Sequence, residues 1–389
     1  MARCSYSMNS SPSRPARHGV ARSHALPILA AAAILGWPAR GQPQAQPPPS
    51  TDSQLMAPAT QPPPPLPKEV ADEVARLEPA IDAALVQPDK VELTTDAIPK
   101  AERILNLRLA HQGATWWEPA AAHQRLSDLK RLASMPSEQR ARLAEARRLI
   151  RRMFQFRREG NCSNALELAE RACEIRGEVL GQEHPDYAVS LNNVAFCLNA
   201  LPGRQLEALE KYEAALATFR RQFLGDHPTT ATFLNNVAYC LNELTDRLSE
   251  SLPKYQAALE MQQRLFTGDH ADVALSLNNV AACLEDLGRP AEALPRHEAA
   301  LAMRQRLFQG DHEDVATSLN NLAHCLQALG RLHDALPKCE AALAMRQRLF
   351  QGDHEDVATS LNNLATCLKA LACPAEALPK FEAALAMYR

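Results

Sequence analysis

Glycine, aromatic residues and net positive charge are all scarce in this 389-residue sequence. It contains 14 glycines and 5% aromatic residues, and its formal net charge is −3. This composition suits helices that pack through small side chains better than it suits a β-sandwich. A nucleic-acid-binding protein would need a basic stripe, so the charge argues against that class. The sequence also lacks a phosphate loop, a nucleotide fingerprint and a paired-carboxylate site. We therefore expect no enzymatic activity and no cofactor.

A long hydrophobic run is missing as well. The apolar run from Ala25 to Leu35 is too short to span a bilayer. It follows a polar segment that carries arginines without acids, and it precedes a small-x-small site at Ala39 and Gly41. This order of features is typical of a signal peptide. Residues 1–41 therefore predict export to the periplasm or the extracellular space, and a leader that stays in the cytoplasm is the alternative.

Two further segments precede the regular part of the chain. Residues 42–67 are crowded with prolines, which predicts an extended linker of the polyproline type. Residues 68–140 show helical spacing of apolar positions, and the segment Leu109–Leu129 loosely resembles the repeat described next, as a degenerate copy would. Its adjacent Trp116 and Trp117 are interpreted either as a ligand platform or as residues that pack over an exposed end of the array.

The rest of the chain consists of copies of one sequence repeat. Copies that begin with glycine are spaced 42 to 44 residues apart, and a partial copy covers residues 141–180. The five full copies start at Gly181, Gly225, Gly268, Gly310 and Gly352. A period of this length marks a stacked array in which each unit buries its apolar face against its neighbours. Residues 141–389 should therefore form one solenoid.

The copy at Gly310 shows what one unit must be. The positions Leu319, Leu322, Ala323 and Leu326 form one stripe of a first helix. A turn at Gly330 follows, and a second helix carries its inner stripe at these small residues: Ala335, Cys339 and Ala342. The equivalent prolines inside the second helices should kink them without ending them; they are Pro253, Pro295, Pro337 and Pro379.

This order resembles the tetratricopeptide pattern of large, large-small, large, glycine, alanine, aromatic, alanine, with Cys339 at the aromatic position. The standard repeat has 34 residues, and the longer unit here, with its L-N-N-[LV]-A and G-D-H motifs, is similar to the kinesin-light-chain type. The resemblance implies an all-α fold, a right-handed superhelical α-solenoid of antiparallel helix pairs. The alanine- and proline-rich composition of the leader fits a bacterial exported protein.

In such arrays the first helices line a concave groove that holds an extended peptide. The resemblance places the second asparagine of each pair in that groove: Asn193, Asn236, Asn279, Asn321 and Asn363. An amide offers both a donor and an acceptor to the backbone of a bound strand. The alternative is that these amides bond within or between the helices of the solenoid. The first asparagine of each pair is less certain to face the groove.

Three residues further along, the inward position varies between copies: Phe196, Tyr239, Ala282, His324 and Thr366. Such variation is what a selectivity surface would show, and neutral drift explains it equally well. Phe196 and Tyr239 suggest an aromatic anchor. Glu243, Glu285 and Asp286 predict a groove that is neutral to mildly acidic.

Neither histidine nor cysteine predicts a chemical site. One G-D-H histidine per repeat cannot share a metal ion, so we expect no metal and interpret these residues as loop and capping residues. Cysteines at one equivalent position lie too far apart for disulfides and should be small packing residues: Cys197, Cys240, Cys283, Cys325 and Cys367. The pattern assigns no role to four others: Cys162, Cys173, Cys339 and Cys373.

The sequence thus predicts a scaffold or adaptor that binds a protein or peptide, without nucleic acid and without a membrane span. One alternative is a regulatory or substrate-recognition module of a protease or kinase. Another is a kinesin-light-chain-like cargo adaptor, which would need a coiled coil that residues 68–158 do not show. The C-terminal repeat has no polar capping helix, so self-association through that end is a further expectation.

Overall fold

The computed structural model describes residues 65–388 except for positions 115 and 245. The predicted signal peptide and most of the predicted linker lie outside the described residues. The described part of the chain forms fifteen helices, and none of its residues is assigned to a strand. None of these helices is long and apolar enough to cross a membrane.

Helices α2 (Lys68–Val86), α3 (Val91–Gln112) and α4 (Trp117–Ser134) form an N-terminal unit with its own hydrophobic cluster around Ile81, Ala97 and Leu129. Helices α5 (Ser137–Arg158) and α6 (Cys162–Leu180) then form the first pair of the array. A turn at Gly160, whose φ of 75° is open to glycine at no steric cost, joins them.

Each full repeat supplies one pair of antiparallel helices joined by a short turn. The first helices are α7 (Pro185–Asn199), α9 (Pro228–Glu243), α11 (Ala271–Asp286), α13 (Glu313–Ala328) and α15 (Glu355–Ala370). The second helices are α8 (Gln205–Gln222), α10 (Leu248–Leu265), α12 (Pro290–Leu307), α14 (Leu332–Leu349) and α16 (Pro374–Met387). The predicted all-α solenoid of helix pairs is confirmed.

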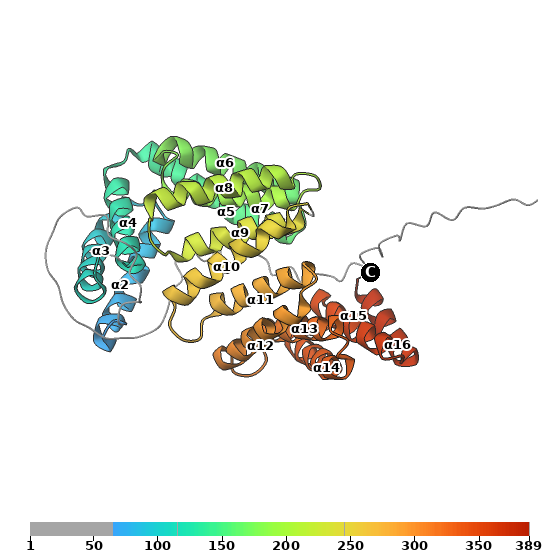
Figure 1. Ribbon diagram of the computed structural model, residues 1–389. Coiled ribbons are helices and arrows are strands. Elements are labelled where there is room, and N and C mark those ends of the chain that lie inside the picture. Colours follow the sequence, from blue (N-terminus) through green and yellow to red (C-terminus); the bar gives the residue numbers. More distant parts are fainter. Residues whose placement is uncertain (1–64, 115, 245, 389) are drawn as a thin grey trace, which may run out of the picture.

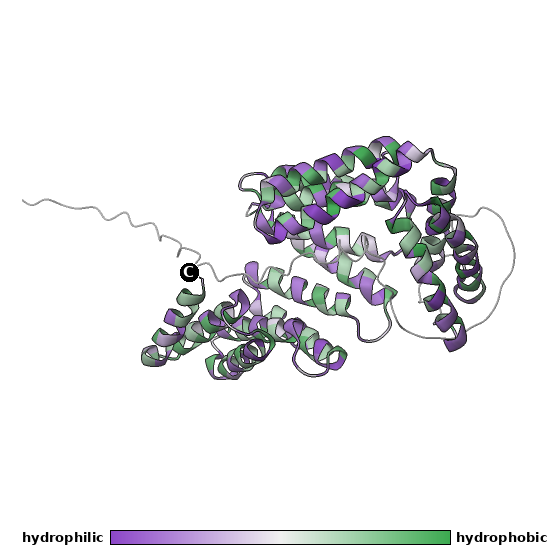
Figure 2. Ribbon diagram, turned by 180° about the vertical axis from the view of Figure 1, so that it is seen from behind, coloured by the Kyte–Doolittle hydropathy of each residue, from purple (hydrophilic) through white to green (hydrophobic). Residues whose placement is uncertain are grey.

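Within the array, each helix packs mainly on its neighbours along the chain, as stacked repeats require. First helices also contact the next first helix, from α9 to α11, α11 to α13 and α13 to α15. They therefore lie on the side of the array where neighbouring repeats approach most closely, which is the inner side of its curve. Figure 1 shows this succession of pairs from green through yellow to red, and Figure 2 shows hydrophobic and hydrophilic residues interleaved along the helices.

The small residues of the repeat occupy the places where helices meet. Ala323, Ala335 and Ala342 are all completely buried, so replacing any of them with a larger side chain would push two helices apart. The four repeated prolines lie inside α10, α12, α14 and α16, as predicted, and the helices continue through them.

The N-terminal unit does not stack on α5 as a further repeat would. Instead, α4 meets the loops of the array: Asp128 bonds His184, and the Arg131 guanidinium donates to the carbonyl oxygen of Leu180 at 3.0 Å. The ring of Trp117 packs edge-on against His227 at 5.8 Å. Trp116 is buried. Both tryptophans thus pack between the N-terminal unit and the array, and Trp117 does so against the loop before α9, inside the array rather than over its end.

The two ends of the array differ in chemistry. On α5, Arg152 occupies the position that holds Leu322 on α13, and it is exposed where that leucine is buried. On α16, Leu385 is 52% exposed, whereas the equivalent Leu343 of α14 is 7% exposed beneath the next first helix. The N-terminal end is therefore polar and the C-terminal face of α16 is apolar.

Candidate functional site

The loops that start the full repeats, G-D-H in four of them and residues 181–184 in the first, have structural roles. Gly310 and Gly352 adopt φ values of 85° and 78°, which other residues rarely adopt. The aspartate of one loop pairs with an arginine at the end of the same repeat: Arg348 donates to Asp311 at 2.6 and 2.7 Å. This hydrogen bond lowers the pKa of the Asp311 carboxyl.

The histidine of each loop is the N-cap of the first helix. Its Nδ1 accepts a hydrogen bond from the backbone amide two residues later, as in His312 with Asp314 at 3.1 Å. The same bond occurs at His184, His227, His270 and His354. Three of these rings also stack on the phenylalanine four residues earlier, at centroid distances of 3.6 to 3.7 Å. The predicted capping role is confirmed.

Capping by a ring nitrogen requires that the nitrogen carry no proton. His227 is 8% exposed, and this burial lowers its pKa from 6.5 to about 3. Burial also lowers the pKa of His270. Both shifts favour the neutral imidazole that the cap needs.

The first asparagine of each pair ties one first helix to the next. Asn278 donates to Ser318 on α13 at 3.2 Å, and Asn320 donates to Ser360 on α15 at 2.9 Å. Asn235 makes the same bond to Ser276. All three asparagines are buried. This row of bonds links neighbouring repeats. Its signal in the sequence is the serine two positions before the asparagine pair of the next repeat, and that serine accepts the bond.

A buried arginine on the second helix completes this connection. Arg346 donates to the backbone oxygen of Asp356 at 3.0 Å and to Ser360 at 3.1 Å, although it is only 1% exposed. Arg304 and Arg176 make the same bonds at their own junctions. These arginines were not singled out from the sequence, because an arginine at a helix end is ordinarily exposed.

One junction replaces this polar connection with aromatic rings. At α8 and α9 the arginine position holds Phe219 and the serine position holds Phe233, and their rings meet at 5.5 Å. Asn192 therefore has no serine opposite it, and it accepts a hydrogen bond from Asn236 instead. With rings at both positions, neither a buried arginine nor a buried serine is left without its partner at this junction.

The second asparagines divide into two groups. Asn193 and Asn236 are 1% and 4% exposed, so they present almost no surface to a partner. Asn279, Asn321 and Asn363 are half-buried on α11, α13 and α15. These three amides lie in one row on the inner helices, and they remain candidates for contact with a bound strand.

The variable positions follow a similar division. Phe196 is buried, with its ring 6.5 Å from Phe154 and beneath the Arg157 guanidinium at 4.4 Å. Tyr239 is half-buried. Ala282, His324 and Thr366 are exposed. The surface that differs most between repeats therefore lies on α11, α13 and α15, beside the three half-buried asparagines.

A carboxylate at the centre of this surface holds two histidines from different helices. Glu285 of α11 lies 3.3 Å from His297 Nε2 of α12 and 3.3 Å from His324 Nδ1 of α13. Burial alone would raise the pKa of Glu285, but its bonds to His297 and His324 lower it to about 2. The hydrogen bond to Glu285 raises the pKa of His324. His324 therefore brings more positive charge to the inner face than an isolated histidine would.

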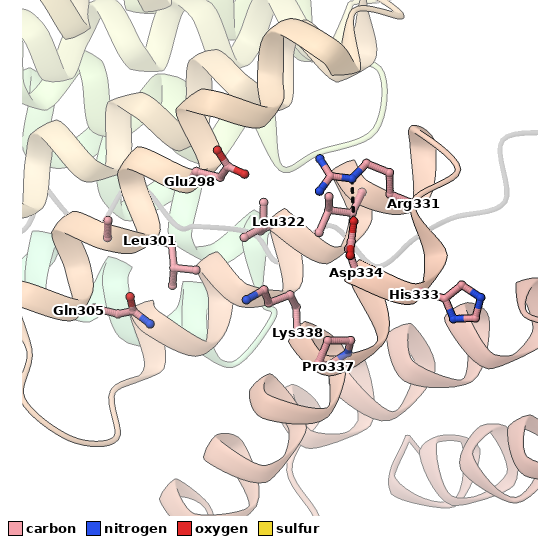
Figure 3. A pocket seen from close by; sticks show the side chains of 11 residues that line it. Glu298, Leu301, Gln305, Leu322, Arg331, His333, Asp334, Pro337 and Lys338 are labelled. Atoms are coloured by element: carbon pink, nitrogen blue, oxygen red, sulfur yellow. Dashed lines mark hydrogen bonds and ion pairs between the residues drawn. The ribbon is translucent and has the colours of Figure 1, made fainter.

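A cavity of about 460 Å³ lies on the opposite side, between α12 and α14. Figure 3 shows Glu298 and Gln305 on one side and Arg331, His333, Asp334 and Lys338 on the other, with Leu301 and Leu322 between them. Arg331 is already paired with Asp334 at 2.8 Å. The rim carries both signs of charge and no converging set of polar atoms, so it does not define a ligand.

The described residues contain no group of three or more histidine, cysteine or acidic side chains arranged to hold a metal ion. The five equivalent cysteines are buried among the helices, where they act as packing residues. Burial raises the pKa of Cys197, Cys240 and Cys325 to about 12, so these thiols are poor nucleophiles.

The comparisons with known proteins agree with this architecture. A family model described as tetratricopeptide repeat matches residues 154–221, 229–306 and 314–389, more than half of the chain. No curated protein sequence matches the chain.

Solved structures of other repeat proteins are similar in fold. The apo form of RapI is 13% identical, with a TM-score of 0.50 over 82% of this chain and 86% of that one. BtubC (BKLC) from P. vanneervenii is 21% identical, with a TM-score of 0.47 over 62% and 91%. A putative kinesin light chain with nearly identical TPR-like repeats from Podosopora anserina is 21% identical, with a TM-score of 0.47 over 55% and 98%.

Proposed function

Because the chain belongs to the tetratricopeptide repeat family, we propose that it is a scaffold that binds an extended segment of a partner protein along α11, α13 and α15. Repeats of this family are in general interaction modules without catalytic activity. The proposal adds a location and a mode of binding to that general role.

One observation carries the proposal: most of the repeated residues are used up inside the array, and two rows stay open to solvent. The loop histidines, the first asparagines, the buried arginines and the packing alanines all bond or pack within the array. The half-buried Asn279, Asn321 and Asn363, and the exposed residues three positions after them, are left over. These two rows lie side by side on the inner helices.

The asparagine row supplies contacts that do not depend on the partner's sequence. Each amide can donate to a backbone carbonyl and accept from a backbone N–H of an extended strand. Preformed helices hold the amides in place, so binding pays little of the ordering cost that a flexible loop would. Asn193 and Asn236 take no part in this contact because they are buried.

The variable row supplies selectivity. Ala282 leaves space, His324 offers a ring with raised pKa, and Thr366 offers a methyl group beside a hydroxyl that already donates to the Asn362 carbonyl at 2.8 Å. Tyr239 adds a half-buried aromatic ring at the neighbouring repeat. A strand that fits this row must present a different side chain to each repeat.

Site-specific photocrosslinking tests the location. A photoreactive amino acid replaces Thr366 on the inner face in one variant and His333 on the outer face in a control variant. We expect the Thr366 variant to crosslink a discrete partner in cells that produce the protein, and the His333 variant to crosslink it much less. Equal crosslinking from both faces would contradict the proposed location.

A further inference from the structure

Two cysteine thiols meet at the junction of the last two repeats. Cys367 belongs to the row of packing cysteines on the first helices. Cys339 lies on α14 at the position that holds Tyr212, Tyr255 and His297 in earlier second helices. Within the described residues this substitution gives α14 and α15 a thiol on each side of their shared interface.

The contacts place both thiols in that interface. The Cys339 sulfur lies 3.9 Å from the backbone oxygen of Asn363, one turn before Cys367 on α15. The Cys367 sulfur lies 3.7 Å from the backbone oxygen of Leu332, two turns before Cys339 on α14. Both residues are completely buried, so each sulfur lies within the packed interface between α14 and α15.

We propose that Cys339 and Cys367 form a disulfide that joins α14 to α15 when the chain folds in the presence of a disulfide oxidant such as oxidised glutathione. One cysteine thiolate attacks oxidised glutathione, which releases one reduced glutathione and leaves a mixed disulfide. The second cysteine thiolate attacks that disulfide and releases a second reduced glutathione. Two electrons pass to glutathione and each cysteine loses its proton.

We expect the disulfide to form during folding and not in the protein that has already folded. Burial raises the pKa of Cys339 to about 12, and it raises the pKa of Cys367 as well. The attacking thiolate is therefore scarce in the folded protein, and an oxidant has no path to the sulfurs. During folding both thiols are exposed, and the docking of α15 on α14 brings them together.

The disulfide would matter most at this place in the array. Within residues 65–388, α15 and α16 pack on a neighbouring helix pair on one side only. A covalent bond to α14 would keep Thr366 and Asn363 in register with the rows before them. The inference does not depend on the proposed partner groove.

Peptide mapping of the full chain tests the bond. The unfolded, reduced protein is refolded in mixed reduced and oxidised glutathione, free thiols are alkylated in denaturant, and the product is cut with trypsin. Cleavage after Lys338 and Arg346 isolates Cys339, and cleavage after Arg348 and Lys369 isolates Cys367. We expect peptides 339–346 and 349–369 to appear linked and to separate on reduction, while the peptides that contain Cys283 and Cys325 are alkylated.

Three results would overturn the proposal: alkylation of both Cys339 and Cys367, glutathione on either of them, or a link from either to another cysteine. A second readout compares melting of the oxidised and reduced forms. We expect the oxidised protein to melt higher and a Cys339→Ser variant to show no such difference. An equal shift in the variant would also contradict the proposal. Because the mapping uses the natural sequence, it stands even where a variant folds poorly.

Discussion

Acid should weaken the array at His227, because that histidine caps α9 in its neutral form. Its Nδ1 accepts from the amide of Thr229 at 3.1 Å, and its ring packs against Phe219 and Phe223. Protonation would remove the acceptor and place a charge in an apolar pocket. The folded state therefore resists the proton that the unfolded chain takes up.

The size of the effect follows from the two pKa values. Burial lowers the pKa of His227 from 6.5 to about 3. The stabilisation is complete above pH 6.5, and it is lost as the pH falls from there toward 3, because the unfolded state binds the proton first. Between pH 7 and pH 4.5 the loss amounts to about 2.5 kcal/mol, at about 1.4 kcal/mol per pKa unit.

Urea unfolding of the full chain and of a His227→Asn variant at both pH values measures this loss. Asparagine is a good N-cap that does not titrate, so the variant should lose about 2.5 kcal/mol less than the natural sequence between the two pH values. The comparison uses the difference between pH values, so any cost of losing the ring cancels. An identical loss in both proteins would refute the reasoning.

Two other regions give further predictions. Replacing the buried Arg346 with methionine should lower the free energy of unfolding by about 3 kcal/mol, because its partners lose a buried, charged donor. Replacing the exposed Arg348 on the same helix with glutamine should lower the free energy of unfolding by less than about 1 kcal/mol. Urea titrations of both variants measure the two losses, and equal losses would contradict this account. If the apolar face of α16 joins two copies of the chain, Leu385→Glu should lower the molar mass measured by light scattering, while the control Leu206→Glu, also on an exposed leucine, should leave it unchanged. A natural protein that is monomeric at all concentrations would rule out this mode of self-association.

The repeat architecture could be predicted because its causes are local and recur. Three local features constrain the packing of one helix pair: the 42-residue period, the apolar stripe through Leu319 and Leu322, and the small residues Ala335 and Ala342. The same features recur in five copies, so each copy supports the same prediction. The capping role of the loop histidines also followed from position, since each precedes a helix that begins with a proline, alanine or acidic residue.

The roles of the asparagines could not be separated from the sequence alone. The two residues of each pair point about 100° apart on a helix, and only the neighbouring repeat decides which of them is covered. Ser318 and Ser360 bind the first asparagines, whereas Asn236 turns to Asn192 because Phe233 stands where a serine would. Such choices depend on residues 40 to 44 positions away along the chain, so the pattern within one repeat does not contain them.

The buried charges were missed for a related reason. The sequence near Arg304 and Arg346 is that of the basic end of a helix, where arginines are ordinarily exposed to solvent. They are buried because the next repeat packs over them. His297 likewise occupies an aromatic position of the repeat, and its contact with Glu285 depends on how α11 and α12 pack.

The measurement that tests the central proposal most directly is affinity capture with the full chain and two triple variants, read by mass spectrometry. One variant replaces Asn279, Asn321 and Asn363 on the inner face with alanine, and the control replaces His333, Asp334 and Lys338 on the outer face. The account predicts that the natural protein and the outer-face variant capture the same partner, and that the inner-face variant loses it while keeping its helicity and melting temperature. Capture that survives in the inner-face variant, or is lost equally in both variants, would contradict the proposed groove.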